Sequence, residues 1–211
     1  MSAAPSGAVK SRRRTNELKS TNQCLCGLVA ALVVLLISAC SDSGMGERVL
    51  AARPAGGDFV LQSAVGPVDS KALRGNALLV YFGYVNCPDI CPVSMAAGAA
   101  ALNGLTPQER EKVKMIMISV DPERDTPAKL KEYVAYFHPA MIGAVGTPAE
   151  TAAIAKSFGA GYVRQATRPD GTYAVDHSSQ TFVIGPDGKL MELLPLGVAT
   201  EKVVATVRKL L

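Results

Sequence analysis

Two cysteines and a distant histidine are the residues of this sequence best suited to chemistry. Cys87 and Cys91 lie in the segment 83–92, GYVNCPDICP, and His177 is one of two histidines in the chain. The common C-x-x-C redox motif has two residues between its cysteines, whereas three stand here, a spacing that allows either a disulfide or a metal ion held from two sides. Soft thiolates favour Cu(I), zinc or an iron–sulfur cluster, and two thiolates complete none of these sites. The spacing leaves three alternatives open: a structural disulfide with a surface histidine, a redox couple, or a metal site.

The neighbouring sequence indicates how these side chains are positioned. The apolar run 77–82 (ALLVYF) predicts a buried strand, so the cysteines follow its carboxyl end, where open α/β sheets place their sites. Pro92 suits the first turn of a helix, whose partly positive N-terminus favours thiolates, and we therefore expect both sulfurs to be activated. If the predicted strand 181–184 runs antiparallel to the first strand, His177 faces the two sulfurs. Such a Cys₂His set suits three-coordinate Cu(I) and leaves room for a further ligand to Cu(II).

Three other residues that can bind metals have simpler interpretations. His138 directly follows a predicted helix, and we expect it to cap that helix or to lie on the surface. Met115 and Met117 alternate with isoleucines in a second apolar run, MIMISV, which predicts another buried strand. These two methionines are therefore assigned to the core.

The predicted elements specify an α/β fold. Two segments, TPQE at 106–109 and TPAE at 147–150, are capping boxes, and Thr126-Pro127 also marks the start of a helix. Hairpins are predicted over 59–68 and 181–194, and a last amphipathic helix carries Val203, Val204, Val207 and Leu210. This order predicts a mixed central sheet flanked by helices, with an N-terminal hairpin. With a cysteine pair directly after the first buried strand, it points to a thioredoxin-like fold.

The N-terminus is typical of an export signal. Residues 10–19 are basic, residues 25–37 are uncharged and mostly apolar, and the sequence Ile-Ser-Ala-Cys ends at Cys40. This ending resembles the bacterial lipobox, so we expect Cys40 to be lipidated, with an uncleaved anchor helix as the alternative. The predicted organisation is a signal peptide or anchor over 1–39, a tether over 40–57 and a globular domain over 58–211. Cys87 and Cys91 are then the only cysteines of that domain.

Composition excludes several classes of protein. The chain has 211 residues, of which 48% are hydrophobic, too many for a disordered chain. Its net charge of +4 comes from the N-terminal segment, because 17 basic and 17 acidic residues remain from residue 40 onward. We therefore expect no nucleic-acid partner.

Three segments together resemble the SCO/SenC family of copper chaperones. They are FGYVNCPDICP at 82–92, SVDPERDTP at 119–127 and VDHS at 175–178, and the resemblance extends from Phe59 to the C-terminus. It implies a thioredoxin-like fold, with Cys87, Cys91 and His177 as the ligands of one copper ion, Cu(I) or Cu(II). It also implies a membrane-anchored domain that faces the periplasm or the mitochondrial intermembrane space. Such proteins help to assemble the binuclear copper site of cytochrome c oxidase.

The resemblance implies a metallochaperone rather than an enzyme, with the copper-site subunit of the oxidase as its partner. Another periplasmic copper chaperone or a thiol reductase is a further expected partner. Two alternative functions are a thiol-disulfide oxidoreductase that reduces the cysteines of the oxidase site, and a redox or copper sensor. Val85-Asn86 replaces the Thr-His often found before the first cysteine, and the lipobox differs from the family's commoner transmembrane anchor.

Three residues of these segments are expected to support the site. Asp89 is interpreted as the cap of the following helix, or as a group that tunes the charge of the metal. Tyr84 is expected to shield the site. Asp121 belongs to a segment that either supports the cysteine loop, docks a partner or forms a turn leading to Thr126.

Overall fold

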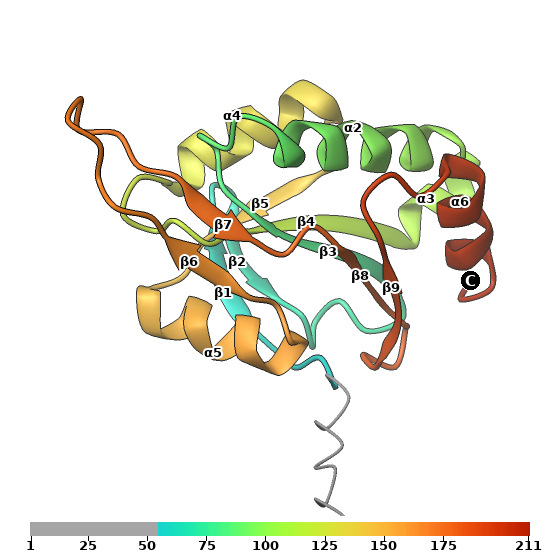
Figure 1. Ribbon diagram of the computed structural model, residues 1–211. Helices are drawn as coiled ribbons and strands as arrows, with labels where there is room; N and C mark the ends of the chain where they lie inside the picture. The colour runs from blue at the N-terminus through green and yellow to red at the C-terminus, as the bar shows by residue number, and fades with distance from the viewer. Residues whose placement is uncertain (1–54) are drawn as a thin grey trace, which may run out of the picture. The chain divides into compact units, whose positions relative to one another are not determined.

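The computed structural model describes residues 55–211 (Figure 1). The predictions for the signal peptide or anchor, for lipidation of Cys40 and for most of the tether lie outside the described residues. Within residues 55–211, no helix is long and apolar enough to cross a membrane.

A five-stranded mixed sheet forms the centre of the domain. Its strand order is β5-β4-β3-β8-β9, in which β3, β4 and β5 are parallel and β8 and β9 are each antiparallel to their inner neighbour. The strands span Ala77–Gly83 (β3), Val113–Ser119 (β4), Ile142–Ala144 (β5), Thr181–Ile184 (β8) and Leu190–Leu194 (β9). The mixed sheet predicted from the sequence is therefore confirmed, as is the antiparallel direction of the strand that follows His177.

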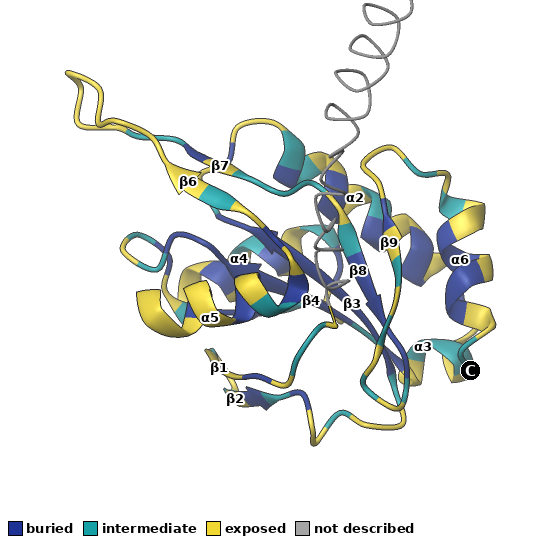
Figure 2. Ribbon diagram, turned by 60° about the horizontal axis from the view of Figure 1, so that its bottom comes forward, coloured by how far each residue is buried: buried dark blue, intermediate teal, exposed yellow. Residues whose placement is uncertain are grey.

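Helices cover both faces of this sheet, which explains the unbroken apolar runs of its inner strands. Figure 1 shows α2, α4 and α6 on one face and α5 on the other, with the short α3 at the end of α2. The helices span Ile90–Asn103 (α2), Pro107–Glu111 (α3), Pro127–Phe137 (α4), Pro148–Phe158 (α5) and Thr200–Arg208 (α6). All seven residues of β3 are buried, and Met115 and Met117 on β4 belong to the core as predicted (Figure 2).

The predicted helix starts are correct. Thr106 and Thr147 form capping boxes with Glu109 and Glu150, and Thr126 accepts a hydrogen bond from the backbone N–H of Lys129. These caps satisfy backbone donors that have no partner within the first turn of a helix. Local sequence therefore fixes where α3, α4 and α5 begin.

One capping prediction was wrong, and the prediction that His138 caps its helix or lies on the surface was correct only in the first part. Asp89 occupies the position before α2, but its side chain makes no capping hydrogen bond in the described structure. His138 does lie at the end of α4, yet it is buried rather than on the surface. Its Nδ1 accepts a hydrogen bond from the backbone N–H of Ala140, and burial lowers the pKa of the imidazole, so the ring is neutral.

Three hairpins accompany the helices. The hairpin of β1 (Val60–Ser63) and β2 (Gly66–Asp69) and the hairpin of β8 and β9 were both predicted. A third, formed by β6 (Tyr162–Arg164) and β7 (Val175–His177), is a separate two-stranded sheet. Its loop extends away from the body of the domain and is largely exposed (Figure 2). Strands of three residues carry too little periodicity to be recognised in the sequence.

Candidate metal centre

Cys87, Cys91 and His177 meet at the carboxyl end of β3. Cys87 lies in the loop after this strand, Cys91 is in the first turn of α2, and His177 is the last residue of β7. His177 Nε2 lies 3.5 Å from Sγ of Cys87 and 3.3 Å from Sγ of Cys91. The three potential ligand atoms all lie within 4.8 Å of one another. The antiparallel pairing of β8 with β3 brings together residues that are 86 and 90 positions apart in the sequence.

The two cysteines are free thiols in different surroundings. Cys91 is completely buried, whereas Cys87 lies at the edge of the buried class with 9% of its surface exposed. Burial raises the pKa of the Cys91 thiol, and the nearby Cys87 raises it further. The expected activation of Cys91 is therefore wrong, because burial disfavours the thiolate and raises the pKa of this thiol. A bound metal ion would have to displace the proton from this sulfur.

His177 presents an unprotonated nitrogen to the two sulfurs. Its Nδ1 lies 3.0 Å from the carbonyl oxygen of Ser178, which can only accept a hydrogen bond, so Nδ1 carries the proton. Nε2 then holds its lone pair toward the thiols. Burial also lowers the pKa of the imidazole, which keeps the ring neutral. A neutral imidazole with a fixed tautomer is the form of histidine that binds metals.

Two tyrosine rings border the imidazole. The rings of Tyr81 and Tyr84 meet the His177 ring edge-on, with centroids 6.0 and 5.7 Å away. Tyr84 is 1% exposed, and its hydroxyl accepts a hydrogen bond from the backbone N–H of Val175 at 3.2 Å. Burial raises the pKa of Tyr84, so its hydroxyl is neutral. Tyr84 thus lies between the candidate site and the core and also contacts the strand of His177.

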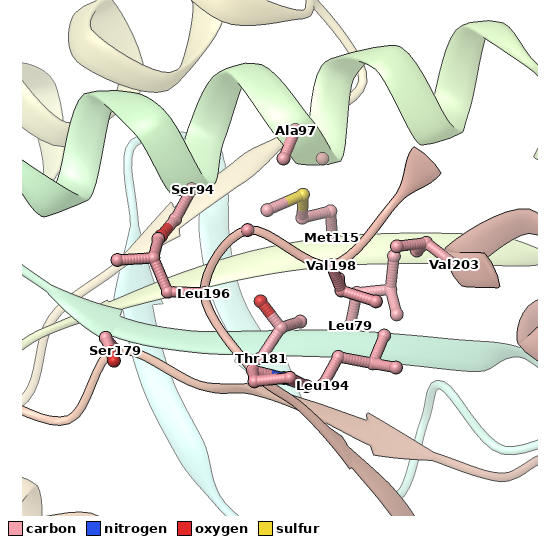
Figure 3. Close-up of a pocket in the computed structure, with 13 residues that line it drawn as sticks. Leu79, Ser94, Ala97, Met115, Ser179, Thr181, Leu194, Leu196, Val198 and Val203 are labelled. Carbon is pink, nitrogen blue, oxygen red and sulfur yellow. The ribbon is translucent and has the colours of Figure 1, made fainter. Parts of the chain in front are cut away.

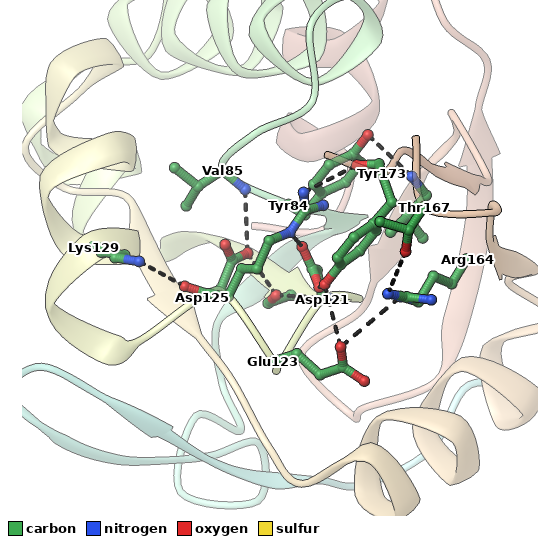
Figure 4. Close-up of polar contacts among 12 residues, drawn as sticks. Tyr84, Val85, Asp121, Glu123, Asp125, Lys129, Arg164, Thr167 and Tyr173 are labelled. Atoms are coloured by element: carbon green, nitrogen blue, oxygen red, sulfur yellow. Dashed lines mark hydrogen bonds and ion pairs between the residues drawn. The ribbon is translucent and has the colours of Figure 1, made fainter. Parts of the chain in front are cut away.

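Asp121 lies in a polar network beside the site (Figure 4). Its carboxylate pairs with Arg124 and accepts a hydrogen bond from the Tyr173 hydroxyl at 2.7 Å. In place of Asp121, Asp125 reaches the cysteine loop, where its Oδ2 accepts a hydrogen bond from the backbone N–H of Val85 at 3.1 Å. The segment from Asp121 to Thr126 was expected to support the cysteine loop, dock a partner or form a turn, and it does contact this loop, through Asp125. Sequence reasoning missed the contact between Arg124 and Tyr173.

A small cavity lies between α2 and the loop after β9 (Figure 3). Its volume of about 30 Å³ exceeds the roughly 10–15 Å³ that one ordered water molecule needs. Its lining is mostly apolar, and the buried Ser94 Oγ has no hydrogen-bond partner within residues 55–211. This cavity has room for ordered water rather than for an organic substrate.

Comparison with known proteins places the chain in a family. A sequence profile described as SCO1/SenC matches residues 48–211. A relative in Stutzerimonas stutzeri, named for copper binding, is 35% identical over 124 residues; the match covers 59% of this chain and 60% of that relative's length.

Two solved structures have the same thioredoxin-like fold. Bradyrhizobium japonicum ScoI, solved with copper bound, is 35% identical with a TM-score of 0.69, over 74% of this chain and 99% of that one. BsSco, described as a member of the Sco family of cytochrome c oxidase assembly proteins, is 27% identical with a TM-score of 0.59, over 75% of this chain and 94% of that one. Because the family profile covers more than half of the sequence, the chain belongs to the SCO1/SenC family.

Proposed function

We propose that this chain binds one copper ion through Cys87, Cys91 and His177 and delivers it to the copper site of cytochrome c oxidase during assembly. The observation that carries the proposal is the convergence of two thiols and an unprotonated imidazole nitrogen within 4.8 Å. Two soft sulfurs and one imidazole match the preference of Cu(I). Relatives that are named for copper binding or solved with copper support the same choice of metal.

The site is suited to release as well as to binding. A three-coordinate Cu(I) ion has an open position, so a thiolate of the acceptor can bind before a donor leaves. Cys87 lies nearer to solvent than the completely buried Cys91 and is the sulfur that an acceptor would replace first. The acceptor we propose is the copper-site subunit of the oxidase, since BsSco is described as belonging to a family of cytochrome c oxidase assembly proteins.

We further propose that the domain is tethered to a bacterial membrane and faces the periplasm. The basic segment 10–19, the apolar segment 25–37 and Cys40 in a lipobox-like sequence support a lipid anchor. An uncleaved N-terminal helix would leave the domain on the same side of the membrane. A periplasmic thiol reductase that keeps both cysteines reduced, or another copper chaperone that supplies the ion, is the further partner of this proposal.

A Cu(I) competition titration tests the proposed site. The fully reduced protein is titrated against a chromogenic Cu(I) chelator beside its His177→Ala variant. Wild type is expected to bind one equivalent, and the variant to bind at least about tenfold more weakly, a loss of about 1.4 kcal/mol. His138→Asn removes the other histidine and serves as the control that retains wild-type affinity. Equal affinities of wild type and His177→Ala would contradict the proposal.

A thiol-disulfide oxidoreductase is the second candidate, because the site contains two neighbouring free thiols. In that function the more exposed Cys87 would attack an external disulfide, and the buried Cys91 would resolve the mixed disulfide. The two functions differ in their need for His177. A dithiol reductant keeps its rate of disulfide reduction in the His177→Ala variant, whereas a copper site loses affinity.

A further inference from the structure

One loop contacts both halves of the candidate metal centre: the loop that carries the two cysteines and the chain segment that leads to His177. The segment between β4 and α4 carries Arg124 and Asp125 as neighbours in the sequence, and their side chains contact different parts of the chain. Figure 4 shows Asp125 beside Val85 of the cysteine loop. Asp125 bonds to the loop that carries the cysteines, and Arg124 bonds to the chain that leads to His177. The separation between the two halves is therefore tied to adjacent residues of one short loop.

Asp125 fixes the start of the cysteine loop. Its carboxylate is 3% exposed, and Oδ2 accepts hydrogen bonds from the backbone N–H of Val85 at 3.1 Å and from the Ser119 hydroxyl at 2.7 Å. Val85 precedes Cys87 by two residues, and Ser119 is the last residue of β4. The carboxylate thus links the cysteine loop to the neighbouring strand of the central sheet, across 40 residues of sequence.

Arg124 fixes the chain before His177. Its Nη1 donates a hydrogen bond to the carbonyl oxygen of Tyr173 at 2.9 Å, and its guanidinium carbon lies 3.6 Å from the centre of the Tyr173 ring. Its Nε pairs with Asp121, which is 3% exposed and also accepts the hydrogen bond from the Tyr173 hydroxyl. Arg124 therefore holds both the backbone and the side chain of a residue four positions before His177.

The strand of His177 needs such an anchor. β7 is three residues long and pairs only with β6, in a two-stranded sheet that is separate from the central sheet within residues 55–211. An isolated two-stranded hairpin is at best marginally stable in water. The buried Val175 side chain and an exposed pair of Arg164 with Glu123 connect this hairpin to the body. Its buried polar anchors are the contacts of Arg124 and Asp121 with Tyr173 and the hydrogen bond from Val175 to the Tyr84 hydroxyl.

We propose that Arg124 and Asp125 are positioning residues for the ligands of Cu(I): Arg124 holds His177 in place and Asp125 holds the cysteine loop, and each thereby sets part of the affinity for Cu(I). Groups that orient metal ligands without touching the metal typically change affinity by about 10- to 100-fold when they are removed. The proposal rests on the proposed copper site. It adds that Arg124 acts through His177, whereas Asp125 acts through the cysteine loop.

A double-mutant cycle on the full chain tests this division. Cu(I) affinity is measured for wild type, Arg124→Gln, His177→Ala and the double variant. Arg124→Gln alone is expected to weaken binding about tenfold. In the His177→Ala background it is expected to have almost no effect, because the ligand it positions is gone. Losses that add in the double variant would show that Arg124 does not act through His177 and would overturn its assignment.

Asp125 gives the opposite pattern in the same assay. Asp125→Ala is expected to weaken Cu(I) binding by similar factors with and without His177, because the cysteine loop remains its target. Asp125→Asn keeps a carbonyl oxygen for the Val85 N–H and is expected to restore affinity to within about twofold of wild type. An Asp125→Ala variant with wild-type affinity would overturn the role of Asp125.

Two further variants separate positioning from general loss of stability. Arg164→Gln is the matched control, because Arg164 also stacks on Tyr173 at 3.9 Å but its other contacts are with the exposed Thr167 and Glu123. It is expected to retain wild-type affinity. If Arg124→Gln does not fold, Tyr173→Phe removes only the hydroxyl, which is bonded to Asp121 and more weakly to the exposed Glu123, and a loss of affinity that again depends on His177 is expected.

The ligands are then counted by X-ray absorption of the Cu(I) complexes. Wild type is expected to show two sulfurs and one nitrogen, and Arg124→Gln two sulfurs with the nitrogen lost or displaced. If wild type and His177→Ala bind Cu(I) equally, the proposed site fails and this inference fails with it. If wild type depends on His177 but Arg124→Gln keeps the nitrogen ligand and full affinity, only this inference fails.

Discussion

At the scale of single residues, Gly83 leaves no room for a side chain next to the site. It ends β3, and a Cβ there would lie 2.7 Å from Sγ of Cys91 and 2.8 Å from Cε1 of Tyr81. We expect Gly83→Ala to lower the free energy of unfolding by about 1–3 kcal/mol, because overpacking forces neighbours out of position. It should also weaken Cu(I) binding, since the displaced atom is the proposed ligand. Urea unfolding and the chelator titration measure the two effects.

Gly161→Ala is the control for this substitution. No atom lies within 4 Å of a Cβ at this position, although Gly161 is close to the proposed site through its N–H bond to Ser178 Oγ. Stability and Cu(I) affinity should both stay close to wild type. Equal effects of the two alanines would show that contact with Cys91 is not what excludes a side chain at Gly83.

Residue types and spacing identify Cys87, Cys91 and His177, but they do not determine the state of the thiols. A helix N-terminus beside Cys91 favours the thiolate, and that contribution is readable in the sequence. The opposing contribution, complete burial of Cys91 beneath the histidine and tyrosine rings, depends on chain segments far away in the sequence. Burial is the larger effect, so the sequence alone predicts the wrong direction for this pKa.

At the scale of elements, Gly98 sets how closely α2 packs against β4. A Cβ at this position would lie 2.1 Å from Sδ and 2.3 Å from Cε of Met115. We expect Gly98→Ala to destabilise the protein by about 1–3 kcal/mol, although alanine is the better helix former. In a Met115→Ala background both contacts shorter than 3 Å are gone and only the flexible end of Met141 lies close, at 3.3 Å, so the same change should stabilise by up to about 1 kcal/mol. Urea unfolding is measured for wild type, the two single variants and the double variant. A decrease in the free energy of unfolding caused by Gly98→Ala in both backgrounds would contradict this account.

The contact between α3 and α6 should depend on pH. Arg208 donates hydrogen bonds to Glu109, and this pairing lowers the pKa of the carboxyl from 4.5 to about 2. A carboxyl whose pKa is lowered by folding stabilises the native state above its unfolded pKa, and that contribution is lost as the pH falls toward the folded pKa. Glu109→Gln should therefore lower the urea midpoint at pH 7, and the difference from wild type should shrink between about pH 4.5 and pH 2.

Glu111→Gln provides the comparison on the same helix. Glu111 is exposed and makes no ion pair within residues 55–211, so its replacement should leave the urea midpoint nearly unchanged at both ends of this pH range. A Glu109→Gln difference that stays constant from pH 7 to pH 3 would mean that the pair with Arg208 does not contribute through charge.

Helices and strands could be predicted from the sequence where the residues that specify them lie close together in the chain. The threonine caps of α3, α4 and α5 and the apolar runs of β3 and β4 depend on residues within a few positions of one another. The hairpin of β6 and β7 was missed because its strands are short and mostly exposed. Its position depends on Arg124 and Tyr173, which are 49 residues apart, and no local pattern encodes that contact.

At the scale of the whole molecule, topology accounts for what the sequence could predict about the site. One antiparallel pairing, β8 with β3, was enough to place His177 beside the cysteines. The same reasoning placed the segment after β4 near the cysteine loop, but it could not predict that Arg124 would also contact the chain before His177. That contact depends on where polar side chains lie after the core has packed, which hydrophobic periodicity does not record.

Cu(I) should stabilise the folded chain mainly through the histidine. An unfolded chain still has Cys87 and Cys91 four positions apart and can bind Cu(I) with two thiols, whereas His177 joins them only in the folded state. If His177 contributes about tenfold in affinity, folding gains about 1.4 kcal/mol, which raises Tm by roughly 3–6 °C for a chain of this size. Thermal unfolding with one equivalent of Cu(I) measures the rise, and a strong Cu(I) chelator should reverse it. An equal rise in His177→Ala would mean that the metal bridges only the two cysteines.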